Sequence, residues 1–150
     1  MAFERRHIEE PTDAAGFIDR GNRYSRNGVY HKAIDDYTKA ISLKPDYGKA
    51  YYLRGAAYGI KGAHDKAIKD YTQAIRLIPD VAQIYFDRGT TYRDQDEYDK
   101  AIKDYSKTIS LKPDYAEAYY SRGSTYRKQG AFHKAIEDFS QAIRHEPANQ

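Results

Sequence analysis

Apolar residues recur along the chain at helical spacing, in two consecutive segments joined by a short turn. The first segment places Phe17, Gly21 and Tyr24 at i, i+4 and i+7, which is one face of a helix. The second segment carries a similar face, made by Ala33, Ile34, Tyr37, Ala40 and Ile41. Gly28 between them is typical of a helix stop, and Pro45 predicts the end of the second helix. The pattern predicts a pair of amphipathic helices.

This two-helix pattern returns with a fixed period of 34 residues. The interval is marked by every proline of the chain: Pro11, Pro45, Pro79, Pro113 and Pro147. Arg-Gly pairs keep the same step, at Arg20-Gly21, Arg54-Gly55, Arg88-Gly89 and Arg122-Gly123. A period between about 20 and 50 residues indicates an array of stacked units. One pair of helices cannot bury its apolar face alone, so the units are expected to pack on one another.

Seven positions of the unit carry a recognisable series of residue types: an aromatic residue, Gly, Tyr, Ala, a second aromatic residue, Ala and Pro. In residues 48–81 these are Tyr51, Gly55, Tyr58, Ala67, Tyr71, Ala74 and Pro79. On these residues the chain resembles the tetratricopeptide repeat family, with four tandem repeats over residues 14–47, 48–81, 82–115 and 116–149. The resemblance implies an all-α fold, a right-handed helix-turn-helix solenoid of about eight helices. Residues 1–13 are expected to be an N-terminal tail before a single domain, 14–149.

Arginine stands in each unit where the family usually has leucine. An aspartate follows at a constant interval, which gives the pairs Arg20/Asp36, Arg54/Asp70, Arg88/Asp104 and Arg122/Asp138. We predict a ladder of Arg–Asp contacts between the two helices of each unit. The alternative is that these arginines bind phosphate.

Single residues predict local differences between the units. Asp96 occupies the turn position that glycine holds elsewhere, which predicts a looser third turn. His64 stands where the other units have tyrosine or phenylalanine, which predicts poorer packing in the second unit. Asp13 and Asp46 are expected to cap the helices that follow them.

Composition excludes several classes of protein. The 150 residues include no cysteine, which excludes disulfides and thiolate metal sites. The 25 basic and 22 acidic residues give a net charge of +3, which does not by itself indicate nucleic acid or an acidic membrane as partner. No apolar run approaches the ~20 residues of a membrane span, and residues 1–10 lack the apolar core of a secretory signal. We expect a cytoplasmic protein with no membrane partner.

The resemblance also implies where a ligand would bind. In the family, the first helices of the units line a concave groove at fixed positions. Here the candidate groove residues are Ile18, Asn22, Arg26, Lys49, Tyr52, Phe86, Thr90, Arg93, Tyr120, Ser124, Arg127 and Lys128.

Two features of this set indicate the kind of ligand. One is an apolar, mostly aromatic row, made by Ile18, Tyr52, Phe86 and Tyr120. We expect that this row is not needed for packing between helices, and aromatic residues of this kind are enriched at binding hot spots. Positive charge toward one edge comes from Arg26, Arg93, Arg127 and Lys128. The prediction is a protein or peptide ligand, extended or helical, with apolar side chains and some acidic character. The alternative is that the row packs against itself along the inner wall.

Chaperone-binding members of the family hold a terminal carboxylate with two lysines, two asparagines and one arginine. Carried onto this chain from the first unit, those positions are Ile18, Asn22, Leu53, Gln83 and Asp87, of which Asn22 alone matches. Carried from the second unit, none of the positions matches. Asp87 and Glu117 would also repel a carboxylate, so we do not expect a receptor for chaperone tails.

Other functions find little support in the residues. The five histidines share no metal-type spacing, and the chain has neither a cysteine nucleophile nor a phosphate-binding glycine loop. We therefore expect no enzyme activity, no catalytic residue, no metal and no cofactor. Two alternatives to peptide binding stay open: a self-assembling structural spacer and an RNA-binding helical-repeat protein. The near balance of acidic and basic residues disfavours nucleic acid.

The last expected helix would present Ile136, Phe139 and Ile143 to water. Arrays of this kind usually close with a helix that is polar outside. Three interpretations stay open: the chain is a piece of a longer array, it forms a homo-oligomer through this uncapped C-terminal helix, or the apolar end is tolerated.

Overall fold

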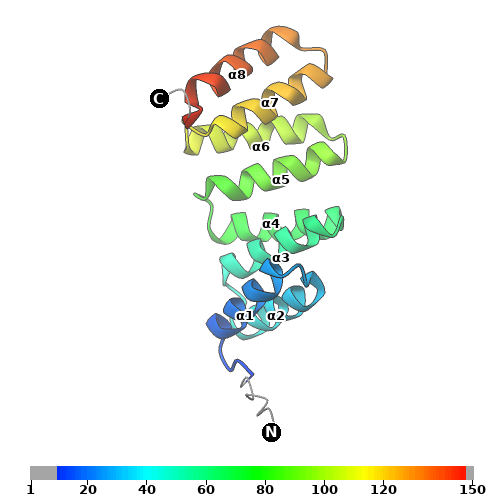
Figure 1. Cartoon of the computed structure of the whole chain (residues 1–150), viewed down its shortest axis with the longest axis vertical. Coiled ribbons are helices and arrows are strands. Elements are labelled where there is room, and N and C mark those ends of the chain that lie inside the picture. Colours follow the sequence, from blue (N-terminus) through cyan, green and yellow to red (C-terminus); the bar gives the residue numbers. More distant parts are fainter. Residues whose placement is uncertain (1–9, 148–150) are drawn as a thin grey trace, which may run out of the picture.

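The computed structural model describes residues 10–147 and contains eight α-helices there, with no strand in that range. The helices are α1 (Ala14–Arg26), α2 (Tyr30–Leu43), α3 (Gly48–Ile60), α4 (His64–Leu77), α5 (Ala82–Asp94), α6 (Tyr98–Leu111), α7 (Ala116–Lys128) and α8 (Phe132–His145). Figure 1 shows them stacked along one long axis, with α1 and α2 at one end and α7 and α8 at the other. None of these helices is both long and apolar enough to cross a bilayer.

Each odd-numbered helix pairs with the even-numbered helix that follows it. The even-numbered helix then packs on the first helix of the next pair, so that α2 meets α3, α4 meets α5 and α6 meets α7. The odd-numbered helices are also neighbours in space, since α5 contacts both α3 and α7. The all-α helix-turn-helix solenoid predicted from the sequence is confirmed. We call the side lined by α1, α3, α5 and α7 the concave face.

Close approach within each pair depends on the glycine in the first helix. A Cβ atom on Gly21 would lie 2.7 Å from the ring of Tyr37, and one on Gly55 would lie 3.0 Å from the ring of Tyr71. The tyrosine of the second helix thus lies directly on the glycine backbone of the first. Glycine in a helix costs about 1 kcal/mol relative to alanine, and here it is required to make room for a buried ring.

The third turn has the same geometry as the others, so the prediction that it would be looser is wrong. Asp96 adopts φ 60°, close to the 77° of Gly62 at the same position of the second unit. The Glu97 N–H donates to the Tyr92 carbonyl at 2.9 Å, as the equivalent N–H does in the other turns. The Asp96 carboxylate also accepts a hydrogen bond from the Tyr98 hydroxyl at 3.0 Å, and aspartate tolerates this left-handed conformation better than most residues.

One of the two predicted helix caps is present. The side chain of Asp13 accepts a hydrogen bond from the Gly16 N–H at 2.8 Å and caps α1, as predicted. Asp46 does not cap α3, because the N-cap position is occupied by Tyr47 and has no side-chain cap. The Tyr47 N–H donates to the Lys44 carbonyl at 3.1 Å, so the chain closes a tight turn at Asp46 before the helix begins at Gly48.

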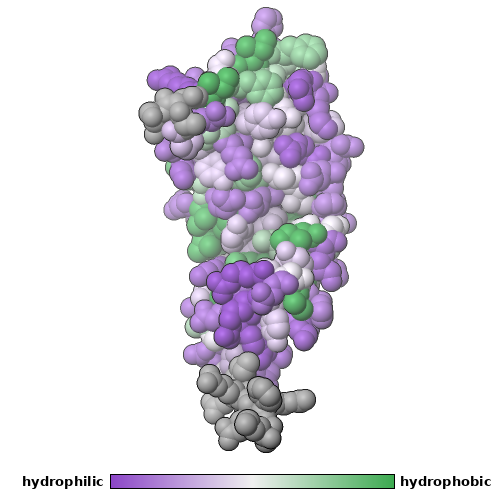
Figure 2. All heavy atoms as spheres, viewed as in Figure 1, coloured by the Kyte–Doolittle hydropathy of each residue, from purple (hydrophilic) through white to green (hydrophobic). Residues whose placement is uncertain are grey.

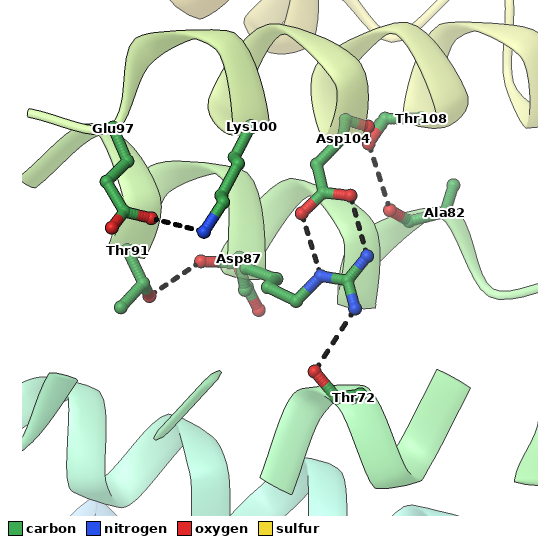
Figure 3. Close-up of polar contacts among 9 residues, drawn as sticks. Thr72, Ala82, Asp87, Thr91, Glu97, Lys100, Asp104 and Thr108 are labelled. Atoms are coloured by element: carbon green, nitrogen blue, oxygen red, sulfur yellow. Dashed lines mark hydrogen bonds and ion pairs between the residues drawn. The ribbon is translucent and has the colours of Figure 1, made fainter. Parts of the chain in front are cut away.

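The predicted Arg–Asp ladder is confirmed in all four pairs. In each, the guanidinium donates Nε–H and Nη2–H to the two oxygens of the aspartate, at 2.7–2.9 Å, and the aspartate is buried. The third contact reaches back to the preceding unit: Arg54 Nη1 donates to Thr38, Arg88 Nη1 to Thr72 and Arg122 Nη1 to Ser106, at 3.1–3.2 Å. Figure 3 shows the two partners of the Arg88 guanidinium, Asp104 of α6 and Thr72 of α4.

Aromatic rings flank the same guanidinium groups. Arg88, for example, has its Cζ 5.9 Å from the ring centroids of both Tyr85 and Tyr92. The other three arginines have equivalent ring pairs. The hydrogen-bonding edge of each guanidinium is occupied by aspartate, and its planar faces are covered by aromatic rings. This favours a structural role for these arginines over phosphate binding.

We expect Arg88→Ala to lower the free energy of unfolding by about 3–5 kcal/mol, because it leaves the buried Asp104 carboxylate without its cation. Urea unfolding followed by circular dichroism measures this. Arg127→Ala removes an exposed arginine of α7 and should change stability by no more than about 0.5 kcal/mol. Equal effects of the two variants would contradict the role assigned to the ladder.

Candidate functional site

The candidate groove residues all lie on the odd-numbered helices, but the structure exposes them unequally. Ile18 and Phe86 are only 2% and 8% exposed. Ile18 belongs to a core cluster with Phe17 and Tyr37, and the ring of Phe86 packs 5.3 Å from that of Tyr115. The prediction that the apolar row is not needed for packing is therefore wrong for these two residues, since both are part of the packed interior.

The other two members of the row differ from each other. Tyr52 is half-buried, and its hydroxyl donates to Asp87 at 2.7 Å. Burial, followed by this hydrogen bond, raises the pKa of Tyr52, so the hydroxyl stays protonated and remains a donor. Tyr120 is 59% exposed, with its ring 5.6 Å from that of Phe139. Of the row, Tyr120 presents the most open aromatic surface to a ligand.

A chain of polar contacts crosses the middle of the concave face. Asp87 of α5 accepts hydrogen bonds from the Tyr52 hydroxyl and from the Gln83 side-chain amide, at 2.7 and 2.9 Å. Gln83 in turn accepts a hydrogen bond from the hydroxyl of Tyr115, the residue just before α7. These contacts tie α3 to α5 and α5 to the start of α7 across the wall of the groove.

Asp87 is a functional candidate that the groove residues predicted from the sequence did not include. Burial raises the pKa of Asp87, the hydrogen bonds from Tyr52 and Gln83 lower it in part, and the nearby charge of Glu117 raises it further. Within residues 10–147 no lysine or arginine forms an ion pair with it. The available signal in the sequence was an acidic residue at a position where the second and fourth units have Leu53 and Ser121.

Two further groove candidates hold the inner ends of buried tyrosines. Asn22 accepts a hydrogen bond from the Tyr37 hydroxyl at 2.7 Å, and the Thr90 hydroxyl lies 3.0 Å from that of Tyr105. The polar groups of Asn22 and Thr90 are therefore already engaged within the structure.

Four basic candidates lie in the last turns of odd-numbered helices. Arg26, Arg127 and Lys128 are exposed in the last turns of α1 and α7, and Arg93 is half-buried in the last turn of α5. Exposed Lys49 and half-buried Ser124 complete the set, on α3 and α7. In the described part of the chain no three His, Asp or Glu side chains gather in a way that could hold a metal ion. The concave face thus combines one exposed aromatic ring, a half-buried carboxylate and a basic edge.

Comparisons with protein families agree with the period of the chain. A family model described as TPR repeat matches residues 21–62 and 89–130. A second, described as tetratricopeptide repeat, matches residues 48–81 and 116–149. No curated protein matches the chain.

Several solved structures share the fold over most of its length. A crystal structure of MamA is 32% identical, with a TM-score of 0.87, over 91% of this chain and 80% of the other. MamA 41-end from Desulfovibrio magneticus RS-1 is 20% identical, with a TM-score of 0.86, over 92% of this chain and 78% of that one. The first TPR of Spaghetti (RPAP3), bound to the HSP90 peptide SRMEEVD, is 26% identical with a TM-score of 0.77; the match covers 79% of this chain and 94% of that protein.

We expect the pH dependence of stability to reveal the raised pKa of the half-buried Asp87 carboxylate. Because its pKa is higher in the folded protein than in the unfolded chain, the folded protein gains stability as the pH falls through that raised value. Asp87→Asn has no such group. Its free energy of unfolding relative to wild type should therefore decrease as the pH is lowered from neutrality toward about 4, the ordinary value for aspartate.

Urea unfolding at a series of pH values measures this difference. Tyr52→Phe removes a hydrogen bond that lowers the pKa of Asp87, so it should make the gain of stability on acidification larger. A difference between D87N and wild type that stays constant over the range would contradict the assignment.

Proposed function

The chain belongs to the tetratricopeptide repeat family, and on that premise we propose that it is a non-enzymatic scaffold whose concave face binds a segment of a partner protein. The exposed ring of Tyr120 on α7, the helix that also carries the cations Arg127 and Lys128 in its last turn, is the observation that carries the proposal. An exposed aromatic residue next to positive charge is the kind of surface that anchors a peptide with apolar and acidic side chains. The peptide bound by the first TPR of Spaghetti supports this class of ligand.

The structure favours an internal segment of a partner over a chain terminus. At the positions that would hold a terminal carboxylate, Ile18 is buried and Asn22 is engaged with Tyr37. Asp87, at the position of a basic residue in such receptors, carries negative charge when ionised. These residues disfavour a terminal carboxylate in the groove, and we propose that the acidic part of the ligand lies nearer Arg127 and Lys128.

We expect Tyr120→Ala to weaken peptide binding by about tenfold or more, as hot-spot aromatics do when truncated. The probes are peptides selected from a displayed random library on the wild-type protein, with affinity measured by fluorescence anisotropy. Binding should persist at about 0.5 M salt, whereas RNA binding would fall steeply. The control is Leu43→Ala, because Leu43 is a large apolar residue, 55% exposed at the end of α2, on neither of the surfaces proposed here. Equal losses in both variants, or none in either, would rule against Tyr120 as an anchor.

A second surface favours self-association. Figure 2 shows apolar groups gathered at the end of the molecule formed by α7 and α8, where Phe132 and Ile136 are 62% and 63% exposed. The equivalent residues of α6, Tyr98 and Ile102, are only half-exposed because α7 packs on that helix. A contiguous exposed apolar surface is typical of an interface.

We propose that this surface meets α8 of a second copy, antiparallel and related by a two-fold axis. Glu137 and Arg144 follow one another along the same flank of α8, so antiparallel pairing brings each opposite its counterpart of unlike charge on the other copy. A head-to-tail stack on α1 fits less well. Where α3 packs on α2 with Ala50, Leu53 and Ala57, α1 carries Gly16, Asp19 and Arg23.

We expect Ile136→Lys to convert a dimer into a monomer of 17.3 kDa in multi-angle light scattering, since it places a charge at the centre of the apolar surface. Ile60→Lys is the control, because Ile60 is 62% exposed on the opposite part of the array. A wild-type protein that remains monomeric at every concentration would contradict the proposal, and so would dissociation by both variants.

A further inference from the structure

A cavity of about 340 Å³ opens on the concave face between α3 and α5. Its walls include Ala56, Gly59 and Ile60 of α3, Asp87 and Asp94 of α5, and Tyr71 behind them. The volume is at the lower end of the range for small-ligand clefts, which suits one amino-acid side chain better than a whole folded partner.

The cavity exists because the second unit has small residues where the others have larger ones. Ala56 takes the position of Asn22 and Thr90, and Gly59 takes that of Ser25 and Arg93. The larger residues hold the tyrosine hydroxyl of their own unit, as Thr90 holds Tyr105. Ala56 has no polar side chain, so it offers no such bond.

Tyr71 is consequently a buried polar side chain whose hydroxyl lacks a partner. The residue is 4% exposed and lines the cavity, and no described residue forms a hydrogen bond with its hydroxyl. Another wall residue, His64, has a buried Nδ1 that also lacks a partner. Buried polar atoms of a native protein are nearly always paired, and among the described side chains the His64 Nδ1 is the one buried atom without a partner. The Tyr71 hydroxyl is open to the cavity, where a ligand group can pair with it.

The charges of the cavity are negative. Asp87 and Asp94 line it, and no lysine or arginine does. Between them lie apolar surfaces from Ala56, Ile60 and Phe86. This arrangement suits a long apolar stem that ends in a cationic group.

We propose that this cavity receives an arginine side chain of the partner segment bound in the groove. The inference rests on the proposed function and specifies the chemistry of its central contact. The guanidinium donates to the carboxylates of Asp87 and Asp94, and the Tyr71 hydroxyl accepts one further hydrogen bond. Each Asp87 oxygen already accepts one bond and can accept another. Arginine fits better than lysine because its planar fork reaches acceptors on several walls and its charge is less strongly hydrated.

The probe is N-acetyl-arginine amide, titrated into the full chain and followed by amide chemical shifts in NMR. The matched probe is N-acetyl-citrulline amide, which has nearly the same shape but no charge. We expect saturable shifts at Gly59, Thr90 and Asp94 with the arginine probe, and affinity about tenfold lower with the citrulline probe.

Two variants close the cavity with side chains that the chain already uses elsewhere. Ala56→Thr copies Thr90 and gives the Tyr71 hydroxyl a partner. Gly59→Ser copies Ser25, and it fits because an added Cβ would meet the Tyr71 hydroxyl at an ordinary 3.6 Å. Each should reduce affinity for the arginine probe about tenfold, by occupying the space of the guanidinium. Ser42→Thr, at an exposed position of α2 outside the concave face, should leave it unchanged. Gly59→Ser keeps the test valid should Ala56→Thr fail to fold.

Equal binding of the two probes would overturn the inference, as would unchanged affinity in Ala56→Thr and Gly59→Ser or the absence of saturable shifts. The experiments also distinguish failure of this inference from failure of the proposed scaffold function. If selected peptides need Tyr120 while the arginine probe does not bind, this inference is wrong and the scaffold stands. If the arginine probe fills the cavity while no peptide binds the concave face, the cavity chemistry stands and the scaffold role falls.

Discussion

The bidentate pair between an arginine of the first helix and an aspartate of the second determines how each helix pair closes. The aspartates are buried, so their charge is tolerated only because the guanidinium is held against them. Two aromatic rings flank each guanidinium, and the third contact of Arg54, Arg88 and Arg122 reaches the preceding unit. One side chain therefore joins two helices of its own unit and one of its neighbour. The shape of the concave face follows from that joint.

On this regular frame the chain distributes irregular residues along the inner wall. The position of Tyr52 is isoleucine, phenylalanine and tyrosine in the other units, and the position of Ala56 is asparagine, threonine and serine. The helix packing does not require a particular side chain at these positions, so each variation changes the chemistry of the concave surface. Tyr120 is exposed, Phe86 is buried, and Ala56 leaves a cavity where Asn22 and Thr90 make a hydrogen bond. The wall of the concave face therefore presents different chemistry from one unit to the next.

The sequence predicted the frame well, because every feature of the frame is periodic and local. The period placed the helix pairs, and the constant interval between Arg88 and Asp104 predicted their contact, because both lie in one unit. The wall was harder to predict. Phe86 is buried by Tyr115, and Tyr52 is held by Asp87, across units and at distances along the chain that no local pattern records. The turn at Asp96 was misjudged for a different reason: backbone hydrogen bonds and a contact from Tyr98 keep its geometry without glycine.

The arginine contact with the preceding unit has a consequence for how such a chain can change in length. Each of the first three units supplies a hydroxyl, from Thr38, Thr72 or Ser106, that accepts a hydrogen bond from the arginine of the next unit. An internal unit carries both an arginine and a hydroxyl for these contacts. Duplicating or deleting such a unit therefore leaves each remaining arginine with a hydroxyl in the unit before it. The gene can therefore gain or lose a unit in a single recombination event without a compensating mutation at the seam.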